Sequence, residues 1–270
     1  MPTLDVNGTT LFYEDTGGSG PPLLFSHGLL WSARMFEAQI AHFQGRFRVI
    51  AWDHRGQGRS ADHDAPSVPV ELVTADALAL MDTLGLDAVH FAGLSMGGFV
   101  GMRLAARHPA RVRSLVLMET TADPEPLENV PRYGRLNFVA RWLGLGLVAN
   151  PVMNIMFSKT FITDPAKAAD RERWRKELLQ NRRTIVRAVQ GIIERAGVAD
   201  ECPRIVAPTT VLVGEEDVAT VPAKAERLVS LIPGAVLERI PRAGHSSSVE
   251  QPELVIAAME RHFSRLAATS

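Results

Sequence analysis

The chain has 270 residues, of which 46% are hydrophobic and 22% are charged, and these fractions exclude an intrinsically disordered protein. Its 29 basic and 30 acidic residues give a formal net charge of −1, which provides no electrostatic attraction to nucleic acid or to an anionic membrane. The single cysteine, Cys202, excludes an internal disulfide and a metal site built from several cysteines.

The amino-terminal residues 1–5 have neither the basic region nor the apolar region of a signal peptide. No apolar run approaches the ~18 residues that a membrane-spanning helix needs. We therefore expect a cytoplasmic protein that has no membrane partner and no nucleic-acid partner.

Two short runs separated by Asn7-Gly8 open the chain, and this dipeptide predicts a hairpin because both residues tolerate positive φ. Mostly apolar runs follow, as expected of strands that are buried on both faces of a parallel sheet. These runs are 23–25, 47–52, 89–92 and 112–118. Between them, apolar residues from Val73 to Leu84 recur at helical spacing, so strands and helices alternate.

This alternation stops over residues 121–200, where three prolines break the chain and helical patterns follow, clearest at 185–193. It then resumes with a strand, a helix, a strand and a final helix, at 209–213, 222–232, 235–240 and 252–266. We therefore predict an α/β core domain made of residues 1–120 and 201–270. A helical cap of residues 121–200 interrupts that core.

The candidate nucleophile is Ser95, in the run Gly93-Leu94-Ser95-Met96-Gly97 between an apolar run and a helical segment. Gly-x-Ser-x-Gly in a strand–turn–helix context is the nucleophile elbow. The serine hydroxyl then stands at the carboxyl end of the sheet, where the helix dipole favours developing negative charge. A phosphate-binding loop would need a different glycine pattern, or a Gly-Lys-Ser/Thr end, and both are absent.

Two backbone N–H groups are the candidate oxyanion donors. One belongs to Met96, the residue after the nucleophile, and the other to Leu29, which follows the first buried strand in Ser26-His27-Gly28-Leu29. Each such donor typically lowers the barrier by about 3–4 kcal/mol. We interpret His27 as a residue that braces this loop through hydrogen bonds rather than as the catalytic base.

The candidate base is His245. A serine needs a base with a pKa near 7, and eight histidines compete for this role. The expected chain order is Ser, then Asp or Glu, then His, and His245 follows the last predicted strand. Gly244 leaves the loop free to aim the imidazole ring.

The candidate acid is Asp217, which directly follows a predicted strand and precedes His245. A buried carboxylate at that position would fix the imidazole tautomer and stabilise the imidazolium. Four rival carboxylates remain open, and they are Glu215, Glu216, Glu119 and Asp123. The polar run 53–60 comes too early for this order, and we interpret it as a structural loop with its own ion pairs.

Several motifs occur in a characteristic order along the chain. They are His27-Gly28, Asp53-x-Arg55-Gly56-x-Gly58-x-Ser60, Gly93-Leu94-Ser95-Met96-Gly97-Gly98, Gly214-x-x-Asp217, and Gly244-His245 followed by Glu250-Gln251-Pro252. With them the chain resembles the α/β-hydrolase superfamily, and within it the small bacterial esterases and 3-oxoadipate enol-lactonases. The resemblance implies an eight-stranded, mostly parallel sheet flanked by helices, a helical cap over the site, and no cofactor.

The resemblance implies a serine hydrolase that cleaves small carboxylic esters or lactones through an acyl-enzyme. Ser95 disfavours the dehalogenases and epoxide hydrolases of this fold, which use an aspartate nucleophile. Cofactor-free perhydrolases, carbon–carbon bond hydrolases and hydroxynitrile lyases keep the serine and remain open. A ligand-binding receptor that retains the triad is the alternative from another class.

The predicted cap carries thirteen Lys/Arg and nine Asp/Glu, so it either attracts an anionic substrate or presents a solvated basic face. Its stretch from Trp142 to Phe161 is strongly apolar and either packs on the core or lines the pocket. We expect this stretch to cover Ser95 and to favour compact acyl groups, of roughly two to eight carbons.

Overall fold

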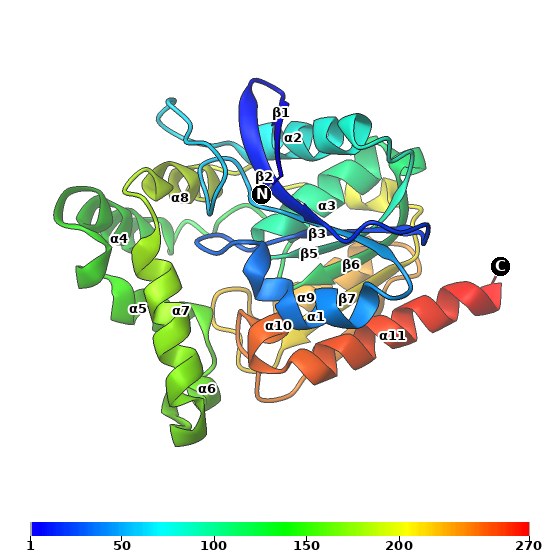
Figure 1. Cartoon of the computed structure of the whole chain (residues 1–270). Coiled ribbons are helices and arrows are strands. Elements are labelled where there is room, and N and C mark those ends of the chain that lie inside the picture. The colour runs from blue at the N-terminus through cyan, green and yellow to red at the C-terminus, as the bar shows by residue number, and fades with distance from the viewer. Residues whose placement is uncertain (1, 270) are drawn as a thin grey trace.

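The computed structural model describes residues 2–269, so Met1 and Ser270, the ends of the predicted ranges 1–120 and 201–270, lie outside it. One eight-stranded sheet crosses the molecule with helices on both faces (Figure 1). The strand order is β1-β2-β4-β3-β5-β6-β7-β8, in which β2 is antiparallel to β1 and β4 and all other neighbours are parallel. The predicted fold class, a mostly parallel eight-stranded sheet flanked by helices, is confirmed.

Every predicted strand and helix of the α/β part is present, with ends that shift by a few residues. The strands are β1 (Thr3–Val6), β2 (Thr9–Asp15), β3 (Pro22–Ser26), β4 (Arg48–Trp52), β5 (Val89–Leu94), β6 (Val112–Met118), β7 (Thr209–Gly214) and β8 (Val236–Ile240). The helices are α1 (Glu37–Phe43), α2 (Val70–Thr83), α3 (Met96–Arg107), α4 (Val130–Leu143), α5 (Ala149–Met156), α6 (Lys159–Thr163), α7 (Ala168–Gln180), α8 (Ile185–Ile193), α9 (Pro222–Leu231), α10 (Ser247–Glu250) and α11 (Pro252–Thr269). Among the residues described, no helix is both long enough and apolar enough to cross a bilayer.

The sheet is buried on both faces, which explains its continuous apolar strands. Successive side chains of a strand point to opposite faces. In β3, Leu23 and Phe25 pack in the cluster that contains α1 and α11, whereas Leu24 packs in the cluster that contains α2 and α3. Figure 1 shows these helix pairs on opposite sides of the sheet. At the amino end, Asn7 and Gly8 have φ values of 47° and 70°, as the predicted hairpin requires.

Helices α4 to α8 and their connections lie between β6 and β7, and we call residues 121–200 the helical insertion. It lies at one end of the sheet, beside the carboxyl ends of the central strands (Figure 1). Helix α8 lies close to the loop that precedes α2, since a Cβ at Gly191 would lie 1.8 Å from the carbonyl oxygen of Val68. The N–H of Val68 also donates to the carbonyl oxygen of Arg187 at 3.0 Å.

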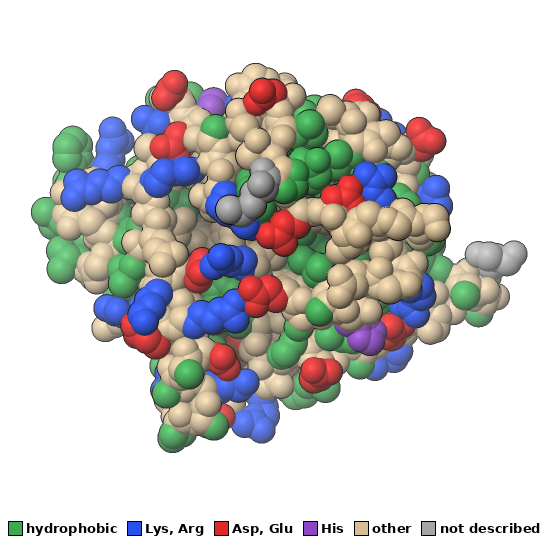
Figure 2. Space-filling view, viewed as in Figure 1, with side chains coloured by type: hydrophobic (Ala, Val, Ile, Leu, Met, Phe, Trp, Pro, Cys, Tyr) green, Lys and Arg blue, Asp and Glu red, His purple; other side chains and the backbone are tan. Residues whose placement is uncertain are grey.

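The apolar stretch from Trp142 to Phe161 differs in part from expectation. Phe157 and Phe161 are buried, but Trp142, Leu143 and Leu147 are 60–66% exposed. These three side chains neither pack on the core nor line the pocket, because they project from the outer side of α4 and the turn after it. In Figure 2, apolar and basic side chains share the surface at this end of the molecule.

Candidate active site

Ser95 occupies a sharp turn between β5 and α3, with φ 50° and ψ −109°. This backbone conformation is strained for a residue with a side chain. The turn is held by close contact with the neighbouring strand, since a Cβ at Gly97 would lie 1.9 Å from the carbonyl oxygen of Ser26. Within the turn, a Cβ at Gly93 would lie 2.3 Å from the carbonyl oxygen of Gly97. The glycines of the predicted elbow are therefore required by backbone packing.

The structure brings Ser95, His245 and Asp217 together in one hydrogen-bonded chain. Nε2 of His245 lies 2.8 Å from Oγ of Ser95, and Nδ1 of the same ring lies 2.9 Å from Oδ2 of Asp217. All three side chains are buried, yet Ser95 and His245 line a pocket. With Nδ1 protonated toward the carboxylate, Nε2 offers a lone pair to the serine hydroxyl.

Asp217 is itself held in place by the loop that follows it. Its Oδ1 accepts hydrogen bonds from the N–H groups of Ala219 (2.8 Å) and Thr220 (3.0 Å). The Thr220 hydroxyl donates to Oδ2 at 2.7 Å and lies 3.2 Å from Nδ1 of His245. Sequence reasoning missed Thr220, although an aspartate with a threonine three residues later is a known pattern of side-chain-to-backbone bonding.

Glu119 was the main rival for the role of the acid, and it makes no hydrogen bond to His245 in the described structure. Its Oε1 accepts a hydrogen bond from the N–H of Gly214 at 3.1 Å. Burial, and next the negative charge of Asp217, raise the pKa of Glu119 well above its ordinary value. The carboxyl group that faces the imidazole is that of Asp217.

The other rival carboxylates bind elsewhere. Glu216 accepts hydrogen bonds from the N–H and the hydroxyl of Thr160. Asp123 forms ion pairs with Lys224 (2.8 Å) and Arg227 (3.0 Å). Glu215 is exposed. None of the three therefore competes with Asp217 for His245.

The predicted oxyanion donors lie on the two segments that flank Ser95. Met96 is the first residue of α3, so its N–H has no intrahelical acceptor. Gly28 lies against the nucleophile, since a Cβ there would lie 3.7 Å from Cβ of Ser95, and Leu29 follows it. Within residues 2–269, the N–H groups of Leu29 and Met96 donate to no protein acceptor. This arrangement leaves two donors near the serine for a ligand oxygen.

The polar run 53–60 holds the loop that carries Leu29. Oδ1 of Asp53 accepts a hydrogen bond from the N–H of Ala33 at 2.9 Å, and Oε1 of Gln57 accepts one from the N–H of Leu30, also at 2.9 Å. Asp53 also forms an ion pair with Arg59 at 3.3 Å. The prediction of a structural loop with its own ion pairs is confirmed. Its side chains also fix the backbone of the loop that carries Leu29.

His27 braces the same region. Its Nε2 accepts a hydrogen bond from the N–H of His54 at 2.8 Å, and its Nδ1 lies 2.7 Å from the carbonyl oxygen of Gly28. The rings of His27 and His54 stack with centroids 3.9 Å apart. Burial lowers the pKa of both rings, so they remain neutral and act as structural hydrogen-bonding groups.

Glu250 is a further residue of the site whose contacts the sequence did not reveal. Its Oε1 accepts hydrogen bonds from the N–H groups on both sides of His245, those of Gly244 (3.0 Å) and Ser246 (3.2 Å). Its Oε2 accepts one from the N–H of Ser158, in the helical insertion, at 2.8 Å. One buried carboxyl group therefore fixes the loop of the imidazole and the start of α6.

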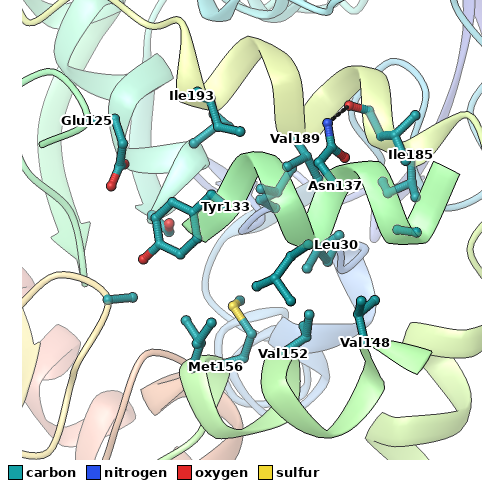
Figure 3. A pocket seen from close by; sticks show the side chains of 18 of the residues that line it. Leu30, Glu125, Tyr133, Asn137, Val148, Val152, Met156, Ile185, Val189 and Ile193 are labelled. Carbon is teal, nitrogen blue, oxygen red and sulfur yellow. Dashed lines mark hydrogen bonds between the residues drawn. The ribbon is translucent and has the colours of Figure 1, made fainter. Parts of the chain in front are cut away.

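A pocket of about 970 Å³, including its mouth to solvent, opens above Ser95. Most of its walls are apolar side chains of the helical insertion, and Leu136 is one of them. Figure 3 shows others, among them Val148, Val152, Met156, Ile185 and Val189. The polar side chains of Glu125 and Tyr133 lie at one end, apart from that of Asn137 (Figure 3). Across residues 2–269, no group of three or more His, Cys, Asp or Glu side chains is arranged to hold a metal ion.

Comparisons with known proteins agree with this architecture. Residues 21–252 match the sequence profile of the family described as alpha/beta hydrolase fold. The chain is 30% identical over 264 residues to 3-oxoadipate enol-lactonase 2 of Acinetobacter baylyi, covering 97% of this chain and 96% of that protein. It superposes on the enol-lactonase from Burkholderia xenovorans LB400 with a TM-score of 0.90 and 29% identity, covering 97% of this chain and 100% of that one. The thermophilic esterase from Thermogutta terrifontis gives the same TM-score and identity, covering 98% and 99%.

Proposed function

Because the chain belongs to the α/β-hydrolase family, we propose that it is a serine hydrolase that cleaves small carboxylic esters or lactones. The observation that carries this proposal is the hydrogen-bonded chain from Ser95 through His245 to Asp217, with distances of 2.8 and 2.9 Å. The likeness to an enol-lactonase and an esterase at 29% identity over nearly the whole chain supports the substrate class.

In the proposed reaction, Oγ of Ser95 forms a bond to the acyl carbon while its proton passes to Nε2 of His245. Asp217 holds the ring and stabilises the imidazolium. The N–H groups of Leu29 and Met96 donate to the oxyanion. The leaving alkoxide, or the ring oxygen of a lactone, takes the proton from His245 as its bond to the acyl carbon breaks. Water, activated by the same imidazole, then releases the acid from the acyl-enzyme.

We also propose that the helical insertion is a cap that closes over Ser95. The pocket is lined jointly by Ser95 and by side chains of α4, α5 and α8. Apolar walls limit water around the reacting carbonyl and strengthen hydrogen bonds to the oxyanion. In this arrangement the α/β part supplies the reacting groups and the insertion selects the acyl group.

The test combines covalent labelling with turnover. The purified protein is treated with a fluorophosphonate probe, and hydrolysis is measured on a panel of p-nitrophenyl esters and small lactones. Labelling at Ser95 together with turnover supports the proposal. Labelling without turnover on any ester or lactone would instead indicate a ligand-binding receptor, and the absence of both would contradict the nucleophile.

A further inference from the structure

The pocket wall contains one buried ion pair. Nη1 of Arg195 lies 2.7 Å from Oε2 of Glu125, and the two side chains are 3% and 9% exposed. Apart from these two and a few uncharged polar groups, the walls are apolar. Taking an ion pair out of water costs free energy that its own attraction does not always recover. A pair at this position therefore points to a role in the pocket.

This ion pair leaves hydrogen-bond donors unused. Arg195 engages its terminal nitrogens with Glu125 and with backbone carbonyl oxygens, but its Nε is buried and has no partner among the described residues. The Tyr133 hydroxyl likewise makes no hydrogen bond to any described group, and Figure 3 shows it turned toward the open space below Glu125. Both oxygens of Glu125 are occupied, by Arg195 and by the side chain of Asn129 (2.9 Å). The Nε–H of Arg195 is closed off from solvent, so the unused donor that faces the pocket is the Tyr133 hydroxyl.

Glu125, Tyr133 and Arg195, which we call the cluster, lie near the helix that begins after the nucleophile. The guanidinium carbon of Arg195 lies 4.4 Å from the ring centroid of Phe99. Phe99 is one helical turn beyond Ser95, to whose carbonyl oxygen its N–H donates at 3.0 Å. One turn advances about 5.4 Å along the axis. Ser95, Glu125, Tyr133 and Arg195 line the same pocket, so a chain attached to Ser95 lies in the space that the cluster borders.

The charges of the cluster determine which group fits. Glu125 and Arg195 neutralise each other, so a carboxylate would bury a third charge beside that of Glu125. A ketone or hydroxyl oxygen accepts a hydrogen bond from the Tyr133 hydroxyl and adds no charge. Burial, and next the charge of Glu125, raise the pKa of Tyr133, so its hydroxyl keeps its proton at neutral pH.

We propose that Glu125, Tyr133 and Arg195 form a recognition site for a neutral oxygen substituent, a ketone or a hydroxyl group, on the acyl chain of the substrate. The Tyr133 hydroxyl donates to that oxygen, and the Glu125–Arg195 ion pair forms the polar wall beside it. This inference rests on the proposed function, because it names the acyl group that the serine would transfer.

The experiment compares p-nitrophenyl hexanoate with p-nitrophenyl 5-oxohexanoate, in which one methylene becomes a carbonyl group. We expect kcat/KM for the oxo ester to exceed that for hexanoate by about tenfold, since the unpaired Tyr133 hydroxyl in the pocket favours a chain that can accept its hydrogen bond. Tyr133→Phe should reduce this ratio several-fold, and the reduction should appear as a higher KM for the oxo ester. Tyr13→Phe, the same substitution at the other tyrosine of the chain, is the matched control and should keep the wild-type ratio.

Two further measurements separate the possible failures. Calorimetry with the Ser95→Ala protein and the ethyl esters of the same acids tests the preference without turnover. Equal hydrolysis and equal binding of the two acyl groups would overturn this inference and leave the proposed function intact. Preferential binding of the oxo ester without hydrolysis by the wild type would support the recognition site and refute the hydrolase. A stronger preference for the p-nitrophenyl monoester of adipic acid, whose chain ends in a carboxylate, would overturn the inference that the site recognises a neutral oxygen substituent.

Discussion

In the α/β body the backbone around the reacting groups leaves no room for a side chain, whereas at the outer end of the helical insertion, in α4 and the turn after it, the backbone is open. A Cβ at Gly97 or at Gly214 would lie within 2.3 Å of a carbonyl oxygen, but Gly134 and Gly146 of the insertion have no such neighbour within 4 Å. The body therefore holds the triad geometry to one arrangement. The part of the insertion around Gly134 and Gly146 has room for additional side-chain atoms, so its residues can vary without disturbing the triad.

The largest loss of activity should follow from substitution of Ser95, in the α/β body. Ser95→Ala should lower kcat by about 10⁵-fold or more, since a triad acts as a unit. Saturation kinetics on p-nitrophenyl acetate measure the loss, and labelling by the fluorophosphonate probe should disappear. A Ser95→Ala protein that still carries the label would place the nucleophile elsewhere.

The next effect concerns the acid. Asp217→Asn should lower kcat by about 10⁴-fold, because the amide stabilises the wrong imidazole tautomer. Glu119→Gln is the matched control, a buried carboxyl group without a hydrogen bond to His245, and it should stay within about tenfold of wild type. An active Asp217→Asn beside an inactive Glu119→Gln would transfer the role to Glu119.

Two glycine substitutions test the packing contrast directly. Gly97→Ala should lower the free energy of unfolding by about 3 kcal/mol, because its methyl group meets the carbonyl oxygen of Ser26. Gly134→Ala, in α4, should raise it by up to about 1 kcal/mol, since alanine favours the helix and has open space around it. Urea unfolding of both variants measures the difference, and similar losses would refute the contrast.

Glu119 should make stability depend on pH. The unfolded chain ionises this carboxyl near its ordinary pKa of about 4.3, whereas the folded protein, in which the pKa is raised, holds the proton to higher pH. The free energy of unfolding should therefore fall as pH rises above that value, by up to about 1.4 kcal/mol per pH unit, until the folded carboxyl ionises. Glu119→Gln removes this contribution. Urea unfolding of both proteins at pH 5 and pH 6 tests it, and parallel changes would contradict the prediction.

The smallest effect concerns the length of the acyl chain, which the insertion limits. Each methylene that the pocket admits should add up to about 0.8 kcal/mol of transition-state binding. Because apolar side chains of the insertion wall the pocket, kcat/KM along a series of p-nitrophenyl esters should rise and then fall, with the best acyl groups at roughly two to eight carbons. A steady rise to the longest soluble chain would show that the pocket continues into an extended groove.

Local signals in the sequence were sufficient to predict most of the α/β body. The Asn7-Gly8 turn, the alternation of strands and helices, and the glycines around Ser95 each depend on the backbone within a few residues. Chain order then selected His245 and Asp217, which the structure brings into contact. The fold was accessible because its signals are short in range, whereas the triad, whose Ser95 and His245 are 150 positions apart, was accessible through the expected chain order.

The rest depends on contacts between distant segments. Glu125 pairs with Arg195 seventy positions away, and Ser158 meets Glu250 across ninety-two, so no local pattern reports either contact. The exposed face of α4 was missed for a different reason. Apolar side chains lie on both of its sides, Leu136 toward the pocket and Trp142 toward solvent, and periodicity cannot say which side is covered.

The Glu250 carboxyl group has a consequence for motion. It holds the N–H groups of Gly244 and Ser246 around the imidazole, and that of Ser158 at the start of α6. Any movement of α6 away from the body therefore has either to break the hydrogen bond at Ser158 or to pull on the carboxyl group that holds the loop of the imidazole.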